Sequence, residues 1–151
     1  PDGMPMRTVN VKDGYAMQYA VKCGYTLAVI SGGASEAMTQ RFRQLGASHI
    51  YMRVSDKAAQ LEVLCREADI RPEEIAYIGD DIVDLPILHM VGLPCAVGDA
   101  VPEVKAAAQI IADTHGGHGA VREIYEIILK TQGLWDQVLT VFQTDTEGAA
   151  Q

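Results

Sequence analysis

A short apolar run that ends in paired acids, Ile75-Ala-Tyr-Ile-Gly-Asp-Asp-Ile-Val-Asp84, most constrains the fold of this 151-residue chain. It predicts a buried strand that delivers Asp80 and Asp81 to its carboxyl end, the edge where open parallel sheets bind ligands. Adjacent carboxylates resist ionising together, and a hard cation relieves that repulsion. Oxygen ligands of this kind suit Mg²⁺, which takes one or two carboxylates and completes its shell with water and phosphate oxygens. The alternative for this segment alone is an Asp pair that caps the next helix.

A second apolar run, Tyr25-Thr-Leu-Ala-Val-Ile30, ends in the glycine-rich segment Ser31-Gly-Gly-Ala-Ser35. A hydroxyl and backbone N–H groups at the start of a helix form an anion site. Lys57 stands at the start of a later helical stretch, where its ammonium can neutralise phosphate charge. Taken singly, a Gly-Gly pair is usually only a turn and such a lysine is usually only solvated. Together with the paired acids, they predict a phosphoryl-transfer site.

The order Ser31, Lys57 and Gly79-Asp-Asp-x-x-Asp84 resembles motifs two, three and four of the haloacid dehalogenase superfamily of phosphohydrolases. Within it, the chain is similar over residues 4–135 to the small, capless phosphatases of 3-deoxy-D-manno-octulosonate 8-phosphate and of nonulosonate 9-phosphates. Five segments carry that closer resemblance: Val9-Asn-Val-Lys-Asp-Gly14, Ala76-Tyr-Ile-Gly-Asp-Asp81, Val91-Gly-Leu-Pro-Cys-Ala-Val97, Asp99-Ala-Val-Pro-Glu-Val104 and Gly116-Gly-His-Gly-Ala-Val-Arg-Glu123.

The resemblance implies a role for each matched residue. Ser31 and Lys57 are catalytic and, with the N–H groups of Gly32 and Gly33, hold the phosphoryl oxygens. Asp80 binds Mg²⁺ directly, and Asp81 acts through a metal-bound water or orients the inner ligands. Asp84 either hydrogen-bonds Lys57 or caps its own helix, and the sequence favours neither. The implied reaction is Mg²⁺-dependent hydrolysis of a sugar-acid phosphate monoester, most simply the octulosonate 8-phosphate of lipopolysaccharide precursor synthesis.

One departure from the family pattern concerns its first motif, a strand that ends in Asp-x-Asp-Gly and carries the nucleophile and the general acid/base. No such motif occurs here, and the chain is expected to begin about 25–35 residues late and to be inactive as written. In the resembling fold this strand is central, between the strands that end at Ser31 and Asp80. Those two strands are therefore expected about 9–10 Å apart with a gap between them, in a chain that is not a self-sufficient fold.

A second departure concerns substrate recognition. Gly33 and Ala34 stand where family members often carry an arginine, so another cation has to read the substrate carboxylate. Arg7, Lys12 and Arg122 are candidates, although each is more simply a solvated side chain. His115-Gly-Gly-His118 is interpreted as a loop rather than a metal pair.

The composition limits the partners. A formal net charge of −8 argues against nucleic acid, and no apolar run is long enough to span a membrane. Three widely spaced cysteines (Cys23, Cys65 and Cys95) are interpreted as buried thiols of a cytoplasmic protein. The absence of a cap domain and an apolar segment around Trp135 predict a homo-oligomer, by family analogy a homotetramer.

Alternating strands and helices predict an α/β fold with right-handed βαβ units and a mainly parallel sheet, a Rossmann-like three-layer sandwich of the capless haloacid dehalogenase type. One domain is expected over residues 1–143, with a flexible tail over 144–151. The alternative function is a non-catalytic module associated with a sugar nucleotidyltransferase. Strands are expected over 25–30, 49–52, 75–79, 93–97 and 109–112. Helices are expected over 13–23, 35–45, 81–90 and 120–130. Two further helices are expected, one capped by Ser55 and one with Pro102 in its first turn.

Overall fold

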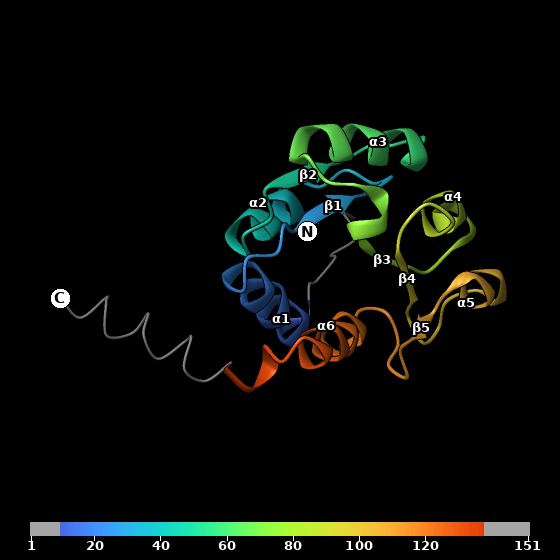
Figure 1. Cartoon of the computed structure of the whole chain (residues 1–151). Coiled ribbons are helices and arrows are strands. Elements are labelled where there is room, and N and C mark those ends of the chain that lie inside the picture. Colours follow the sequence, from blue (N-terminus) through green and yellow to red (C-terminus); the bar gives the residue numbers. More distant parts are fainter. Residues whose placement is uncertain (1–9, 138–151) are drawn as a thin grey trace, which may run out of the picture.

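The computed structural model of the chain describes residues 10–137 and alternates helices with strands (Figure 1). The α-helices are α1 Val11–Lys22, α2 Glu36–Gln44, α3 Lys57–Ala68, α4 Leu85–Leu88, α5 Pro102–Ala107 and α6 Ala120–Thr131. The strands are β1 Ala28–Ile30, β2 His49–Tyr51, β3 Ala76–Gly79, β4 Leu93–Ala96 and β5 Ile110–Ile111. Short 3₁₀ turns occupy Pro72–Glu74, Ile82–Asp84 and Trp135–Gln137. The predicted tail over residues 144–151 lies outside the described residues.

The strands form two parallel sheets rather than the single sheet that their alternation predicts. β1 pairs with β2, while β3, β4 and β5 pair in that order. β1 and β3 do not pair with each other, and a cavity of about 620 Å³, here called the slot, lies between them. Its walls include Ala28 and Ile30 on one side and Ala76 and Tyr77 on the other. The interruption falls where the sequence places a missing strand, which itself remains a prediction.

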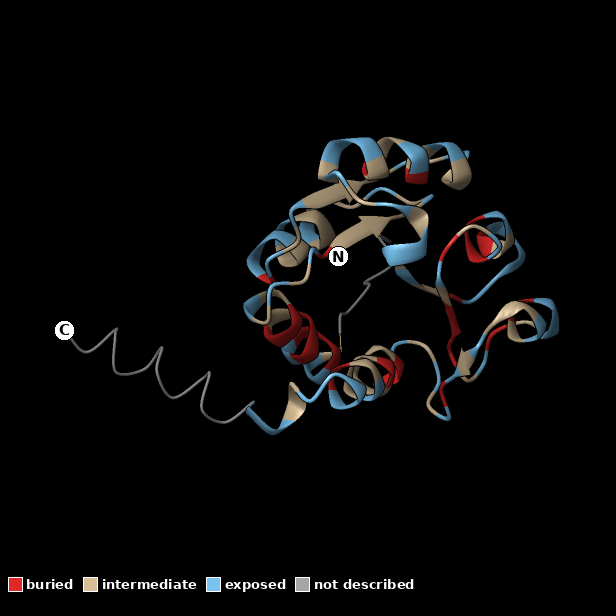
Figure 2. Ribbon diagram, viewed as in Figure 1, coloured by how far each residue is buried: buried red, intermediate tan, exposed pale blue. Residues whose placement is uncertain are grey.

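Helices cover both faces of the strands and give the predicted three layers. On one face, α3 and α4 contact each other, and Leu61 and Ile87 form a core with Ile30 and Tyr77. On the other face, α1, α2 and α6 share a core around Leu27. The buried residues of α1 and α6 lie on the sides that these two helices turn inward (Figure 2). Among the described residues, no helix is both long and apolar enough to cross a bilayer.

Asp13, the first residue of the helix expected over 13–23, lies inside α1 and caps a different helix. Asn10 is the N-cap of α1, and its side chain accepts hydrogen bonds from the backbone of Lys12 and Asp13. Asp13 is 4 % exposed, and its carboxylate accepts the Arg122 backbone N–H in the first turn of α6 at 2.9 Å. Because the N-cap of α6 is Gly119, which has no side chain, α6 takes its capping acceptor from α1.

Two other local predictions are wrong. The N-cap of α3 is Asp56 rather than Ser55, because the Asp56 carboxylate accepts the Ala59 N–H at 3.0 Å. The helix expected over 81–90 is a 3₁₀ turn followed by one turn of α-helix. Asp84 turns its side chain back onto the preceding backbone, and Pro86 has no N–H to donate to the turn before it, so a regular helix does not extend through them.

Candidate active site

The turn after β1 forms the first wall of the site. Ser31 N donates to Tyr51 O at 2.9 Å, and Val54 N donates to Ser31 O at 3.0 Å, so the loop after β2 fixes the turn. Gly33 N donates to Ser31 Oγ at 3.2 Å. This bond uses an acceptor site of the hydroxyl and leaves its proton available for an incoming anion. Neither Gly32 nor Gly33 has a positive φ, so their use here is the absence of side chains rather than unusual backbone.

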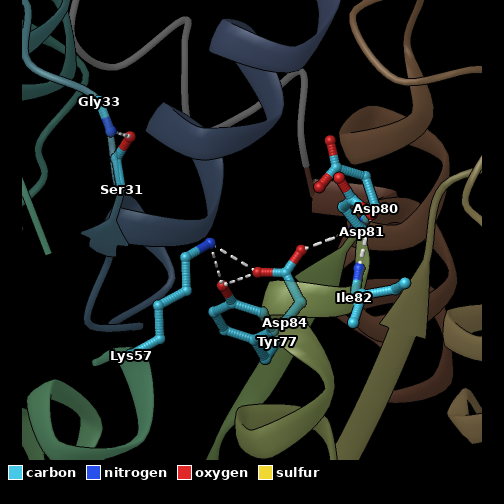
Figure 3. A network of polar contacts seen from close by, with 8 residues as sticks. All are labelled: Ser31, Gly33, Lys57, Tyr77, Asp80, Asp81, Ile82 and Asp84. Carbon is cyan, nitrogen blue, oxygen red and sulfur yellow. Dashed lines mark hydrogen bonds and ion pairs between the residues drawn. The ribbon is translucent and has the colours of Figure 1, made fainter. Parts of the chain in front are cut away.

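Lys57, the first residue of α3, extends its side chain toward the turn after β3. Its Nζ lies 2.6 Å from Asp84 Oδ1 and 3.5 Å from the Tyr77 hydroxyl (Figure 3). The lysine side chain is 15 % exposed and that of Asp84 is 3 % exposed, so the pair is well shielded from water. Lys57 belongs to the β1–β2 side of the molecule and Asp84 to the β3 side, and this ion pair joins the two.

The Asp84 carboxylate is the centre of a hydrogen-bonded network. Besides Lys57, it accepts from the Tyr77 hydroxyl at 2.8 Å and from the backbone N–H groups of Asp80 and Asp81 at 2.9 and 3.3 Å. Burial alone would raise the pKa of Asp84, but the bonds from Lys57, the Asp80 backbone and Tyr77 outweigh it and lower the pKa to about 2. Of the two roles that the sequence left open, the bond to Lys57 is therefore present, whereas the Asp84 side chain caps the 3₁₀ turn Ile82–Asp84 through the Asp81 N–H and makes no cap hydrogen bond to α4.

Gly79 makes this arrangement possible. A Cβ at this position would lie 2.9 Å from the Asp84 Cβ and 3.2 Å from Leu88 Cδ1. Tyr77 and Gly79 are two residues apart on β3, so they present the same face of the strand. Asp84 sits over the bare glycine, and the Tyr77 ring reaches it from the neighbouring position on that face.

Tyr77 is a site residue that the sequence analysis missed. Burial and the Asp84 carboxylate raise its pKa, so the phenol stays protonated and donates to the carboxylate. Its position inside an apolar strand made it look like a core residue, and it does pack in the core as well. The signal that could have found it is its place two residues before Gly79, on the face over which the acids fold.

The paired acids at the end of β3 fit a hard cation. Asp80 and Asp81 are both exposed, unlike Asp84. Although Asp80 is exposed, loss of solvation at its carboxyl group and the neighbouring Asp84 raise its pKa, and a cation would relieve the repulsion between the two carboxylates. Asp81 Oδ1 accepts the Ile82 N–H at 2.7 Å, which fixes its side chain beside Asp80. Within residues 10–137, no group of three or more acids, histidines or cysteines gathers as a metal site, so further ligands have to come from water, substrate or another carboxylate.

The weaker candidates lie elsewhere or are engaged. Arg122 bonds Glu126, and its guanidinium lies 4.9 Å from the centroid of the Trp135 ring. Trp135 also packs edge-on against Tyr19 of the same chain. Lys12 is exposed on α1, and Arg7 lies outside the described residues.

The His115–His118 segment is the predicted loop. Its backbone forms a turn, with His118 N donating to His115 O at 3.0 Å. Cys95 is buried as expected, whereas Cys23 and Cys65 are half-buried, and all three thiols are free.

Comparison with known proteins identifies the family to which the chain belongs. Residues 33–124 match the model of the haloacid dehalogenase-like hydrolases. Over 136 residues the chain is 35% identical to the 3-deoxy-D-manno-octulosonate 8-phosphate phosphatase of Escherichia coli strain K12, which covers 90% of this chain and 72% of the relative. The chain belongs to this phosphatase family of haloacid dehalogenase-like hydrolases.

Solved structures of haloacid dehalogenase-like phosphatases have the same fold. The phosphatase from Moraxella catarrhalis, solved with magnesium, phosphate and its sugar acid, matches with a TM-score of 0.88 at 34% identity, covering 93% of this chain and 81% of the relative. The cobalt-bound phosphatase from Haemophilus influenzae matches with a TM-score of 0.83 at 35% identity, covering 87% and 77%. The α/β fold predicted from the sequence is thus confirmed, as is the resemblance to this family.

Proposed function

We propose that this chain forms the phosphate-binding and metal-binding part of a Mg²⁺-dependent phosphatase that hydrolyses 3-deoxy-D-manno-octulosonate 8-phosphate, a step in lipopolysaccharide precursor synthesis. One observation carries the proposal. The Lys57 ammonium lies on the buried carboxylate of Asp84, so the cationic wall of the site meets the acidic wall at the carboxyl ends of β1 and β3. The named substrate of the Escherichia coli relative supports the choice of sugar acid.

Each residue of the chain has a task in the proposed reaction. The Ser31 hydroxyl and the Gly32 N–H orient the oxygens of the transferring phosphoryl group, and the Gly33 N–H joins them by exchanging its bond to Ser31 Oγ for one to phosphate. The Lys57 ammonium offsets the negative charge of the phosphoryl group. Asp80 and Asp81 hold the Mg²⁺, which when bound neutralises further phosphate charge. This is positioning and charge compensation, the main protein contributions to phosphoryl transfer.

The nucleophile is proposed to come from a strand in the slot. The facing edges of β1 and β3 leave backbone groups without strand partners across an apolar cavity, and an extended segment parallel to both would pair with them. An Asp-x-Asp-Gly sequence at its carboxyl end would lie between Ser31 and Asp80. Its first Asp would attack phosphorus and form an aspartyl-phosphate. Its second would protonate the leaving alkoxide and then activate the water that releases phosphate.

A comparison of two proteins tests the proposal. One is the chain of residues 1–151 alone, and the other is the same chain preceded by an apolar strand that ends in Asp-x-Asp-Gly and by a hairpin. With Mg²⁺ and the octulosonate 8-phosphate, we expect phosphate release from the extended protein and none from the shorter one. An extended control with Asn in place of the first Asp should be inactive. No turnover by a folded extended protein would refute the phosphatase and favour the non-catalytic module.

We further propose that the active form is a homo-oligomer, by analogy a homotetramer, in the cytoplasm. The site lies at an open sheet edge, and no domain within residues 10–137 is placed to cover it. A neighbouring subunit would exclude water from it. Light scattering of the extended protein tests this, and a stable, fully active monomer would contradict it.

A further inference from the structure

The backbone at Arg53, just after β2, has an unusual conformation. Its φ is 56°, in the left-handed region, which is sterically unfavourable for a residue with a long side chain. Among residues 10–137, Asp69 is the one other non-glycine residue with a positive φ, and it ends α3 as its C-cap. Aspartate tolerates this conformation through local hydrogen bonds, and arginine does not. A strained residue beside a candidate site indicates that its position serves the site.

Arg53 lies against the phosphate-binding turn. Its backbone N–H donates to Gly33 O at 2.9 Å, and the next residue, Val54, donates to Ser31 O. The left-handed residue thus lets the loop after β2 fold back onto the turn after β1. Gly33 and Ala34 also occupy the place where members of the resembling family often carry an arginine. The guanidinium of Arg53 therefore starts from the same wall of the site.

The Arg53 side chain is available to bind a ligand. It is exposed, and within residues 10–137 its guanidinium has neither a hydrogen bond nor an ion pair. Arg71 and Arg122 each pair with a glutamate. Arg41, Arg43 and Arg66 also have no ion pair within residues 10–137, but they stand in the last turns of α2 and α3 rather than in a loop bonded to the turn after β1. In a chain with a formal net charge of −8, an arginine left without an acidic partner beside an anion site is positioned for an anionic ligand.

We propose that Arg53 binds the carboxylate of the sugar-acid substrate and so distinguishes it from other phosphate monoesters. This inference rests on the proposed function. Ser31, Gly32 and Lys57 already serve the phosphoryl group, whereas the substrate bears its carboxylate at the opposite end of an eight-carbon chain. The planar guanidinium fork matches a carboxylate with two parallel hydrogen bonds. A cation on the outer wall of the turn suits this second, distant charge.

Substitution of Arg53 by glycine separates recognition from backbone strain. Arg53→Gly removes the guanidinium and also relieves the left-handed conformation. In the strand-extended protein we expect KM for the octulosonate 8-phosphate to rise about tenfold or more, with kcat changed by less than threefold. KM for p-nitrophenyl phosphate, which has no carboxylate, should not change. The melting temperature should rise by about 2–4 °C as strain is lost.

Asp69→Gly is the matched control, because it relieves a left-handed residue on the far end of α3. It should stabilise the protein or leave it unchanged, with KM unaltered for both substrates. If Arg53→Gly raises both KM values equally, Arg53 binds phosphate and the proposal is wrong. Unchanged KM for the sugar-acid phosphate would show a merely solvated side chain, which also overturns it.

A binding measurement keeps the inference separate from the proposed function. Free 3-deoxy-D-manno-octulosonate is titrated into the strand-extended protein that carries Asn in place of the first Asp, and the Arg53 Nε–H signal is followed by NMR. A saturable shift of that signal is expected even if no form of the protein hydrolyses the phosphate ester. Absence of any shift at millimolar sugar acid would overturn the inference, whereas absence of turnover alone would overturn only the phosphatase.

Discussion

The two half-sheets differ in how they are buried and in what they bring to the site. β4 lies between two partners, and three of its four residues are buried. No residue of β1 or β2 is fully buried, and β1 has one partner. Parallel strands are ordinarily covered on both faces and paired on both edges. The β3–β5 half is therefore a conventional core, and the β1–β2 half depends on helices to hold it in place.

The functional groups divide along the same line. The hydroxyl and the cations, at Ser31, Arg53 and Lys57, belong to the β1–β2 half, and the carboxylates belong to the β3–β5 half. Among the charged candidate site residues, the β1–β2 half supplies only the cations and the β3–β5 half only the carboxylates. The site forms where the less buried half is fixed against the more buried one, and the contact between Lys57 and Asp84 makes that connection.

The largest expected effect is on kcat and comes from removing Lys57, the β1–β2 partner of the Lys57–Asp84 ion pair. Lys57→Ala should lower kcat of the strand-extended protein by about two to three orders of magnitude, the scale for loss of one charge-stabilising group. Steady-state hydrolysis of the octulosonate 8-phosphate measures it. A rate within threefold of the unsubstituted protein would exclude Lys57 from the mechanism.

Removing the connection on the β3–β5 side should mainly cost stability. Asp84→Asn leaves the shielded ammonium of Lys57 without its counter-charge, a loss on the order of 3 kcal/mol in the free energy of unfolding. Because the pKa of Asp84 falls from 3.8 to about 2 on folding, its stabilisation is present above about pH 4 and is lost as pH falls toward 2.

Urea unfolding of the original and Asp84→Asn chains from pH 7 to pH 2 measures this difference. The two should converge at the acid end. A difference that stays constant down to pH 2 would show that the ionised carboxylate is not its source.

A smaller effect is expected from a bond that lies wholly within the β3–β5 half. Tyr77→Phe removes one donor from Asp84 but leaves Lys57 and two backbone N–H groups, at a cost of about 1–1.5 kcal/mol. Tyr51→Phe is the matched control, because Tyr51 also donates to a carboxylate, that of Glu67, away from the site. Since that pair is exposed, its loss should cost less. Equal losses in urea unfolding would contradict a special role for Tyr77.

The smallest effect should have the opposite sign. The pKa of Asp80 is raised on folding, so its ionised form is disfavoured in the fold, and stability falls as pH rises from below 3.8 through the folded-state pKa. Asp80→Asn should therefore stabilise the metal-free chain at pH 7, by less than about 1 kcal/mol because the side chain is exposed. The same substitution should abolish Mg²⁺ binding by the extended protein in calorimetry. Destabilisation at pH 7 would contradict the raised pKa of Asp80, and unchanged Mg²⁺ binding would contradict its assignment as a metal ligand.

Local patterns in the sequence predicted the elements and the matched motifs well. The apolar runs ending at Ile30 and Gly79 are strands, Ser35 caps α2, and Pro102 begins α5. What local patterns could not supply was tertiary pairing. Asp13 caps a helix that lies 109 positions away, and this choice depends on how α1 and α6 pack rather than on neighbouring residues.

The site residues could be predicted from the sequence only where the residue type itself indicates the chemistry. Lysine and paired aspartates do so, and the structure brings Lys57, Asp80 and Asp84 close together. Tyr77 was not predicted as a site residue because a tyrosine within an apolar strand is ordinarily a core residue. Arg53 was hidden because its significance lies in a backbone angle, and nothing in Tyr51-Met-Arg-Val-Ser55 marks a left-handed residue.

The contact between the first and last described helices has a kinetic consequence. α1 packs along α6, Asp13 caps α6, and the Tyr19 hydroxyl bonds the backbone of Leu134. Both contacts close loops of more than one hundred residues, and contacts so distant in sequence form late and slow the folding of a chain. When only the β1–β2 half has left the ribosome, the face of α1 that packs on α6 is therefore still exposed. Completion of the fold has to wait until α6 has emerged from the ribosome.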